Sequence, residues 1–422
     1  MFGNSGLSLE QAPPINVVLR LLLIATFFGI IVGVEIFLFN NHLLNSNSSE
    51  ALIVVHTLTL GVMASFMIGA LFQMLPVLSG VFVKSAELLS IRVSYTLLFG
   101  TIFLLSYFGN GSGIALSFAI IFLSYSLFMT SITIFNKLKT VKHSATSRGM
   151  LLAISSLFIV AFIGIILLLI RWGFGIDIDY QALKFAHFSF GLFGWIALLV
   201  VSVSFQVIEM FYVTTEFNTI YSKYMPIAIF VLLWVNIALA FFGLEFQYFV
   251  FTLIDLLLLF HLIQIAWKLK KRKRKVKDGT VWLWYLASGS FVGFSLLVIE
   301  ANFIEINPFF MATLFAFFAT SIAIAMRYKI VPFLVWFHLN SKGYFEAPMM
   351  HEIVHPKYIR VTFWLYFASL LSFFASFLLP FFLYIGSILF IVTFLLLFIS
   401  IYNAINRYNY ILKYGKRIDF NF

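Results

Sequence analysis

The sequence predicts an all-α polytopic membrane protein with about twelve transmembrane helices. Apolar residues make up 62% of its 422 residues, charged residues only 10%, and the mean hydropathy is +1.05. A soluble domain is about half apolar, and one of this length cannot bury so many Phe, Leu and Ile side chains. We infer that lipid surrounds the chain. The absence of cysteine excludes disulfides, iron–sulfur clusters and thiolate-ligated haem.

Twelve apolar runs follow one another along the chain, and we expect them to form a single membrane domain over residues 1–422. A helix of about 20 residues crosses the bilayer core of about 30 Å. The N-terminus lacks the basic region and cleavage site of a signal peptide, so the first run is expected to be a true span. The runs cover approximately 16–39, 51–82, 91–108, 113–136, 149–170, 182–208, 225–243, 247–267, 281–300, 308–330, 359–379 and 381–403.

Basic residues gather on one side of these predicted spans. If the N-terminus is cytoplasmic, all but two of the 27 Lys and Arg residues lie on the inner side, and the exceptions are Arg171 and Lys184. Acids such as Glu35 and Asp177 occupy the outer connections instead. We therefore expect both termini inside, in the cytoplasmic membrane of a prokaryote. The basic run 268–277 lies between two spans and leaves no room for a nucleic-acid-binding module, so we exclude nucleic acid as a partner.

Predicted spans two, six and ten resemble one another. Each begins at the outer face with a polar residue and ends at the inner face with a similar tail. The tails are Gln73-Met-Leu-Pro-Val, Gln206-Val-Ile-Glu-Met and Lys329-Ile-Val-Pro-Phe. Internal repeats are common in membrane folds. The spacing predicts three pseudo-equivalent four-helix units, over about 1–145, 146–278 and 279–422.

The motifs HTLTLG, GALFQMLPV, AHFSFGLFGW and KIVPFLVWFH, together with twelve spans in units of four, resemble haem–copper oxidase subunit I and its divergent NnrS-like relatives. The resemblance covers the layout of the whole chain but only these short motifs in sequence. It implies that His56 matches a haem ligand on helix two and that His187 matches a copper ligand on helix six. Spans 225–243 and 308–330 lack the oxidase histidines. Conventional oxygen reduction with proton pumping is therefore not expected.

His56 and His187 lie at similar depth in equivalent spans, and ionisable residues within a membrane usually mark functional sites. One hypothesis is that His56 ligates a b-type haem or a copper ion, with His187 or Met311 completing the site. Small residues follow each histidine and allow either close helix packing or room for a macrocycle. Arg171 and Lys184 would hold haem propionates or are ordinary loop charges. The alternative is that each imidazole donates to a backbone carbonyl and only packs helices.

Further polar residues lie within or at the ends of the spans. Asp255 belongs to a proton or ion path, or bonds Thr252 or a neighbouring helix. His261, six residues later, should point to the opposite side of the helix. Polar residues at the inner ends of the three repeat spans form a last group: Gln73, Gln206, Glu209, Arg327 and Lys329. They either line an inner vestibule or have structural roles. In the second case the two cations snorkel to the membrane surface and the amides form hydrogen bonds between helices.

The sequence His351-Glu352-Ile-Val-His355 is a literal HEIVH motif, which on a helix would bind zinc for a metalloprotease. Pro356 follows directly and disfavours helical geometry at His355. A third ligand would have to be His338, Glu346 or a residue of another loop.

These observations favour an integral membrane protein that binds haem or copper and acts in redox chemistry related to nitric oxide or respiration. The lipid bilayer and a redox partner at the outer face are its expected partners, and whether it is an enzyme stays open. The alternative is a secondary transporter, which the repeats and Asp255 would also fit. A membrane zinc metalloprotease is the third reading.

Overall fold

A computed structural model describes residues 13–45, 47–344 and 346–416, and twelve helical segments in it are long and apolar enough to cross a membrane. Those ranges contain no β-strand. The prediction of an all-α protein with twelve spans is confirmed. The stretch before Pro13, where we expected no signal peptide, lies outside the described residues.

Ten spans are single α-helices, and spans two and six are each built from three helical pieces. The single helices are α1 (Ile15–Phe39), α4 (Ala86–Asn110), α5 (Gly113–Leu138), α6 (Ala145–Trp172), α9 (Thr219–Phe241), α10 (Phe246–Lys270), α11 (Gly279–Glu300), α12 (Pro308–Ser341), α14 (Pro356–Ala375) and α15 (Phe381–Tyr414). Two short helices lie outside the spans, η2 (Asn40–Leu44) and α13 (Met350–Ile353).

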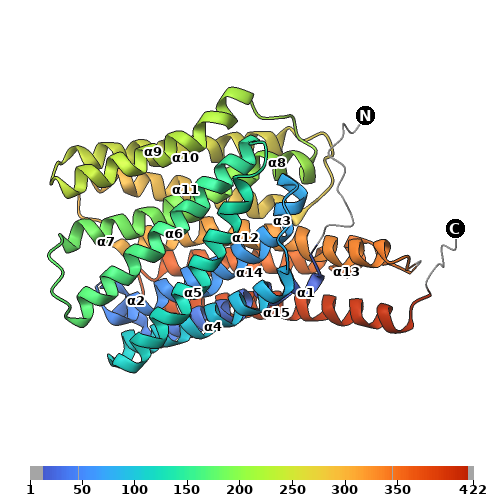
Figure 1. Cartoon of the computed structure of the whole chain (residues 1–422), viewed down its shortest axis with the longest axis horizontal. Helices are drawn as coiled ribbons and strands as arrows, with labels where there is room; N and C mark the ends of the chain where they lie inside the picture. Colours follow the sequence, from blue (N-terminus) through green and yellow to red (C-terminus); the bar gives the residue numbers. More distant parts are fainter. Residues whose placement is uncertain (1–12, 46, 345, 417–422) are drawn as a thin grey trace.

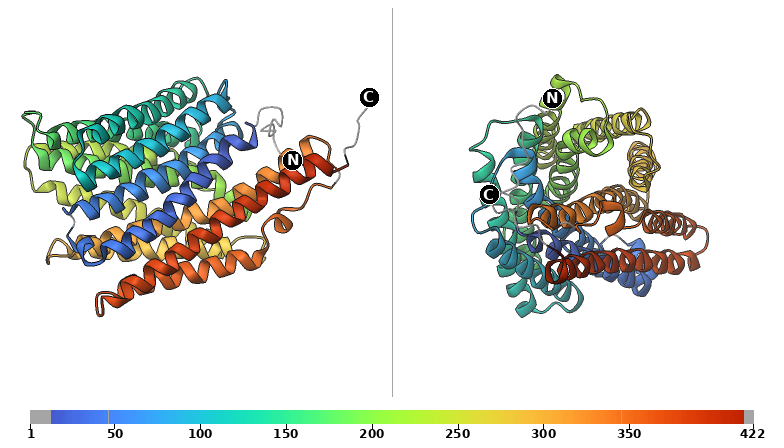
Figure 2. Two further views of the ribbon diagram at one scale, coloured as in Figure 1. Left: turned by 90° about the horizontal axis from the view of Figure 1, so that it is seen from below. Right: turned by 90° about the vertical axis from the view of Figure 1, so that its right-hand side faces the viewer.

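The helices run side by side in one bundle, with α1 packed on α15, α4 on α5, and α11 on α12 (Figure 1). The first residues of α1 and the last residues of α15 lie at the same end of the bundle, as two termini on one side of a membrane require. Following the charge distribution, we call this the inner end. Figure 2 shows α15 along one edge of the bundle.

Spans two and six are interrupted by π-helix, which the sequence did not predict. Span two consists of α2 (Ser49–His56), the π-helix η3 (Thr57–Ala64) and α3 (Ser65–Ser79). Span six consists of α7 (Tyr180–Phe188), the π-helix η4 (Ser189–Ala197) and α8 (Leu198–Tyr212). π-Helix is rare and is often found at functional sites. Its occurrence in both spans supports the similarity between them, while the division into three units stays a prediction.

Several helices begin before the predicted apolar run because a polar cap residue precedes it. Ser144 accepts a hydrogen bond from the Ser147 N–H at the start of α6. Asn218 accepts from the Ile220 N–H at the start of α9, six residues before the predicted boundary at 225. Such caps satisfy backbone N–H groups that have no partner in the first turn of a helix.

Two helices end later than predicted. α12 continues past Pro332 to Ser341, and α15 continues to Tyr414, although the apolar runs end near 330 and 403. The extensions are tied to the segment between them, because the Tyr344 hydroxyl donates to the Leu412 carbonyl at 3.1 Å. A tertiary contact thus stabilises the parts of both helices that lie beyond their apolar runs.

Candidate metal-binding site

The structure brings His56 and His187 together. Their ring centroids are 6.3 Å apart, and the ring planes differ by 23°. His56 is the last residue of α2, and His187 is the last but one of α7, so both lie where a π-helix begins. Both side chains are partly buried. The two residues that the sequence paired by depth therefore share one site.

Each imidazole is held by a backbone carbonyl through the same ring nitrogen. His56 Nδ1 lies 2.8 Å from the Leu52 carbonyl oxygen, and His187 Nδ1 lies 3.1 Å from the Val160 carbonyl oxygen on α6. A carbonyl only accepts, so Nδ1 carries the proton in both rings, and each Nε2 keeps its lone pair. Histidines that ligate metals usually have this arrangement.

An aromatic side chain and a cation form the outer rim of the site. The Phe108 ring on α4 lies 5.0 Å from the His56 ring, centroid to centroid. The Arg171 guanidinium, in the last turn of α6, lies 5.8 Å from the centroid of Phe108. Arg171 is exposed. It therefore sits one aromatic ring away from the histidine pair, where an anionic group could meet it.

The glycines near the histidines bring helices together. A Cβ atom on Gly164 would lie 3.0 Å from His187 Cε1, so α6 passes directly beside that ring. The space beside Gly61 is filled by the Phe28 ring, and a Cβ on Gly194 would lie 2.7 Å from the Ser156 hydroxyl. Of the two uses that the sequence left open for these small residues, the structure shows close packing.

Glu35, which the sequence placed with the acids of the outer connections, is instead a buried residue of α1. It is 8% exposed, and its Oε1 accepts a hydrogen bond from the Thr57 hydroxyl at 2.8 Å. Thr57 directly follows His56 and opens the π-helix η3. The second carboxyl oxygen has no partner among the described residues. An isolated acid inside an otherwise apolar run (IVGVEIFLF) was the available signal.

Met311 and Lys184 make no contact with the histidine pair among those described above. Met311 lies in the first turn of α12 and packs, partly buried, against the apolar core. Its role as an axial ligand stays a prediction. Lys184 Nζ donates to the Asn47 side-chain oxygen at 2.7 Å, which links α7 to the turn before α2. Lys184 therefore lies on a helix rather than in a loop, and this contact fits the alternative in which it is an ordinary charge.

Asp255 and His261 belong to separate polar contacts. Asp255 is fully buried, and its Oδ1 accepts from the Ser295 hydroxyl on α11 at 3.1 Å, while Oδ2 has no partner among the described residues. His261 lies 2.8 Å from the Tyr221 hydroxyl through Nδ1 and 2.7 Å from the Ser204 hydroxyl through Nε2. The two residues face different helices, as their spacing predicted, and Asp255 bonds a neighbouring helix rather than Thr252.

The polar residues near the inner end are mostly bound locally. Lys329 pairs with Asp278 at 2.5 Å, and Glu209 accepts from the Phe217 N–H at 2.7 Å. Burial raises the pKa of Asp278, but the Lys329 ammonium and the Thr280 hydrogen bonds outweigh it and hold the pKa below its ordinary value. These contacts favour structural roles over a vestibule.

Gln73, Gln206 and Arg327 complete this group. Gln73 is 4% exposed, and its side-chain oxygen has no partner among the described residues, whereas Gln206 is partly buried. Arg327 is 2% exposed and donates through Nη1 to the Leu397 carbonyl at 2.9 Å. It therefore does not snorkel to the membrane surface.

The HEIVH residues do not lie on one helix. α13 ends at Ile353, and His355 is the cap of the next helix, where its Nδ1 accepts from the Lys357 N–H at 3.2 Å. Glu352 folds back to accept from the Met349 N–H at 2.8 Å. The two imidazoles therefore lack the one-turn spacing on a single helix that this zinc motif requires.

No group of three or more His, Asp or Glu side chains within the described ranges is arranged to hold a metal ion, so the pair would be a two-residue site. The chain matches no protein-family model, and a comparison with curated proteins finds no similar sequence.

Proposed function

We propose that His56 and His187 hold one metal ion near the outer face of the membrane, and that the protein is a redox protein with an arrangement like that of oxidase subunit I. The observation that carries this proposal is the pair of imidazoles at 6.3 Å, each fixed through Nδ1 so that its Nε2 is available. Backbone bonding alone also fits the packing alternative. That alternative gives no reason for two such rings to meet at equivalent positions of two similar spans.

The ring separation agrees with two imidazoles on opposite sides of one metal. A metal–nitrogen bond of about 2 Å, plus about 1 Å from nitrogen to ring centre, places two such centroids about 6 Å apart. Imidazole suits copper, zinc and iron. Apart from the buried Glu35 next to Thr57, the surroundings described above are aromatic and apolar, and they suit an ion of low charge such as Cu(I).

Copper fits this site more simply than haem. A haem would need the same two imidazoles with a macrocycle between the helices, but the spaces beside Gly61 and Gly194 are filled by Phe28 and Ser156. Binding haem b would therefore require the spans to separate, and Arg171 would be the residue placed to hold a propionate. Bound copper would supply one-electron chemistry, and Arg171 at the rim would face a redox partner or a small anion.

A role in nitric oxide or respiratory chemistry rests on the resemblance to the oxidase-like family. The missing histidines of spans seven and ten keep conventional oxygen reduction out of the proposal. The pair alone supports electron transfer or binding of a small ligand at the metal.

Metal content and spectra of the purified protein test this proposal. We expect about one copper per chain, and His56→Ala and His187→Ala should each lower the affinity by at least about tenfold. His143→Ala is the control, because His143 is exposed on the connection between α5 and α6 and is not part of the histidine pair. A Soret band lost in His56→Ala would assign haem in place of copper. Protein that binds neither copper nor haem on reconstitution would refute the proposal.

A secondary transporter is the second candidate, because two observations favour it. The π-helices η3 and η4 interrupt spans two and six, and Asp255 is a buried carboxyl group with one unpaired oxygen. Ion-dependent uptake into proteoliposomes that is lost in Asp255→Asn, with metal content unchanged in that variant, would favour transport. The absence of uptake under an imposed ion gradient would count against it.

A further inference from the structure

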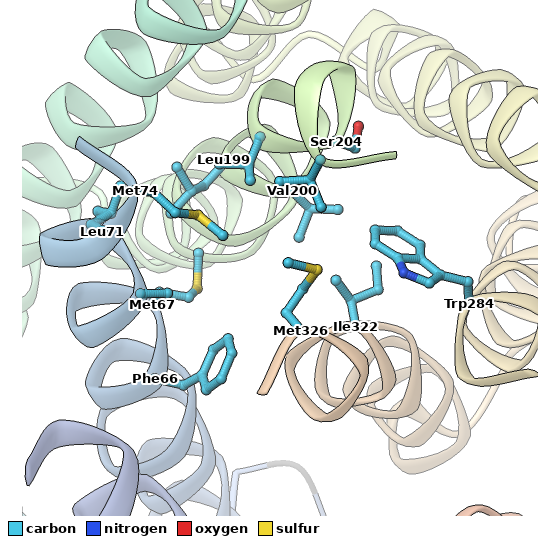
Figure 3. A pocket seen from close by; sticks show the side chains of 13 residues that line it. Phe66, Met67, Leu71, Met74, Leu199, Val200, Ser204, Trp284, Ile322 and Met326 are labelled. Atoms are coloured by element: carbon cyan, nitrogen blue, oxygen red, sulfur yellow. The ribbon is translucent and has the colours of Figure 1, made fainter. Parts of the chain in front are cut away.

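A small cavity lies where spans two, six and ten meet. Its volume is ≈ 60 Å³, and its walls come from α3, α8, α11 and α12. Figure 3 shows the side chains of Met67, Met74 and Met326 directed into it, with Trp284 on the α11 side. It lies further along span two than His56 and is distinct from the histidine pair.

Every polar side-chain group at the wall is already engaged elsewhere. The Ser204 hydroxyl donates to the Val201 carbonyl at 2.8 Å and accepts from His261 Nε2 at 2.7 Å. The Trp284 indole N–H donates to the Tyr212 hydroxyl at 3.1 Å. A buried water needs two to four hydrogen-bonding partners. The side chains of the wall offer at most the second lone pair of Ser204 Oγ, which is too few, so water is a poor occupant.

A cation is also disfavoured, although thioether sulfurs are good ligands for Cu(I). No carboxylate lines the cavity, and Arg327, directly after Met326, is 2% exposed. A metal ion here would be buried without a counter-charge and close to another buried positive charge, which is strongly unfavourable. A neutral occupant avoids this cost.

We infer that the cavity between spans two, six and ten is a dry binding site for a neutral apolar molecule of the size of a diatomic gas. An engineered apolar cavity of about 150 Å³ stays empty of water and takes up benzene or xenon, and the smaller space here restricts the ligand accordingly. Three flexible Met side chains can adjust to such a guest. The inference goes beyond the proposed function, since it does not depend on a metal at His56.

Xenon is the probe for this site. Crystals of the full-length protein pressurised with xenon should show an anomalous peak among Met67, Met74 and Met326. Ala70→Leu, which adds bulk at the cavity wall, should abolish that peak. The matched control is Ala312→Leu, which makes the same change at an exposed position of α12 and should keep the peak. His56→Ala should keep it as well, which separates this test from that of the metal site.

Three outcomes would overturn the inference: ordered water in the cavity of the wild-type protein, no xenon there, or an undiminished peak in Ala70→Leu. If Ala70→Leu does not fold, Met326→Phe fills the same space from α12. Because each variant fills a void, the folded forms should have a melting temperature equal to or above that of the wild-type protein.

Discussion

Three histidines within the membrane spans, His261, His56 and His187, differ in how many of their two ring nitrogens have a hydrogen-bond partner. His261 uses both nitrogens, with Tyr221 and Ser204. His56 and His187 use only Nδ1 for the hydrogen bonds described. The first pattern is complete without a ligand, because both the donor and the acceptor are engaged. The second leaves one ring nitrogen of each histidine without a bond among those described, on two rings whose centroids are 6.3 Å apart, and this is why we propose the metal site there.

Arg327 and Lys329 are two cations on α12 with opposite surroundings. Arg327 is buried, and its Nε and Nη2 have no partner in the described chain, whereas Lys329 pairs with Asp278. We expect Arg327→Met to raise the unfolding free energy by about 1–4 kcal/mol, because it removes a buried charge that lacks an acidic partner. Lys329→Met should lower stability, since it leaves Asp278 unpaired. Melting temperatures in one detergent compare the two, and a lower value for Arg327→Met than for Lys329→Met would contradict this.

The Asp278–Lys329 pair predicts how stability depends on pH. The folded state holds the pKa of Asp278 below its ordinary value of 3.8. The stabilisation is therefore complete above about pH 4 and is lost as the pH falls through the lower folded value. The difference in melting temperature between the wild-type protein and Asp278→Asn should be constant from pH 7 to 5 and shrink below pH 4. A difference that grows on acidification would be inconsistent with the pair.

The π-helices η3 and η4 begin next to His56 and His187, and we expect them to influence which way the two rings point. A π-helical segment holds extra residues per turn, so the helix after it is rotated relative to a continuous α-helix. In span two, the rotation of α2 about its axis therefore differs from that of α3. His56 on α2 contacts His187, while Met67 and Met74 on α3 face the cavity. One continuous helix would fix both faces together.

Deleting one residue from η3 should therefore disrupt the site. Removal of Leu60 shortens Thr57–Ala64 and turns α2 by about 100° relative to α3, since each α-helical residue contributes that angle. We expect a loss of copper binding of at least about tenfold, measured by competition with a Cu(I) chelator. Leu60→Ala keeps the length and is the control. Equal copper affinity in both variants would show that the π-helix does not orient His56.

The whole molecule is organised by charge relative to the membrane. The absence of cysteine makes this arrangement directly measurable, because any introduced cysteine is unique. A membrane-impermeant maleimide added to intact cells should label Gly175→Cys, in the connection after α6, and should not label Thr140→Cys, in the connection before α6. Both positions are exposed. Permeabilised cells should show labelling of both, and the reverse pattern in intact cells would invert the proposed orientation.

Contacts between helices that are distant in the chain account for the features that the sequence did not predict. The twelve spans followed from apolar runs, but the ends of α12 and α15 did not, because Tyr344 and Leu412 hold them through a tertiary contact. Glu35 looked like one of several outer acids until its bond to Thr57 placed it beside the candidate site. Arg327 fitted snorkelling by its position, yet α15 covers it.

Hydropathy and charge are properties of each segment by itself, so the sequence determined the number of spans and the asymmetry of the connections. It also selected His56 and His187, because both stand out against an apolar background. Whether the two rings meet depends on how α2, α6 and α7 pack, and hydropathy carries no information about that. The distance between the two rings and the close packing at the glycines depend on contacts between residues far apart in the chain, so only the tertiary structure shows them. The break between His351 and His355 is local by contrast, and Pro356 already indicated it.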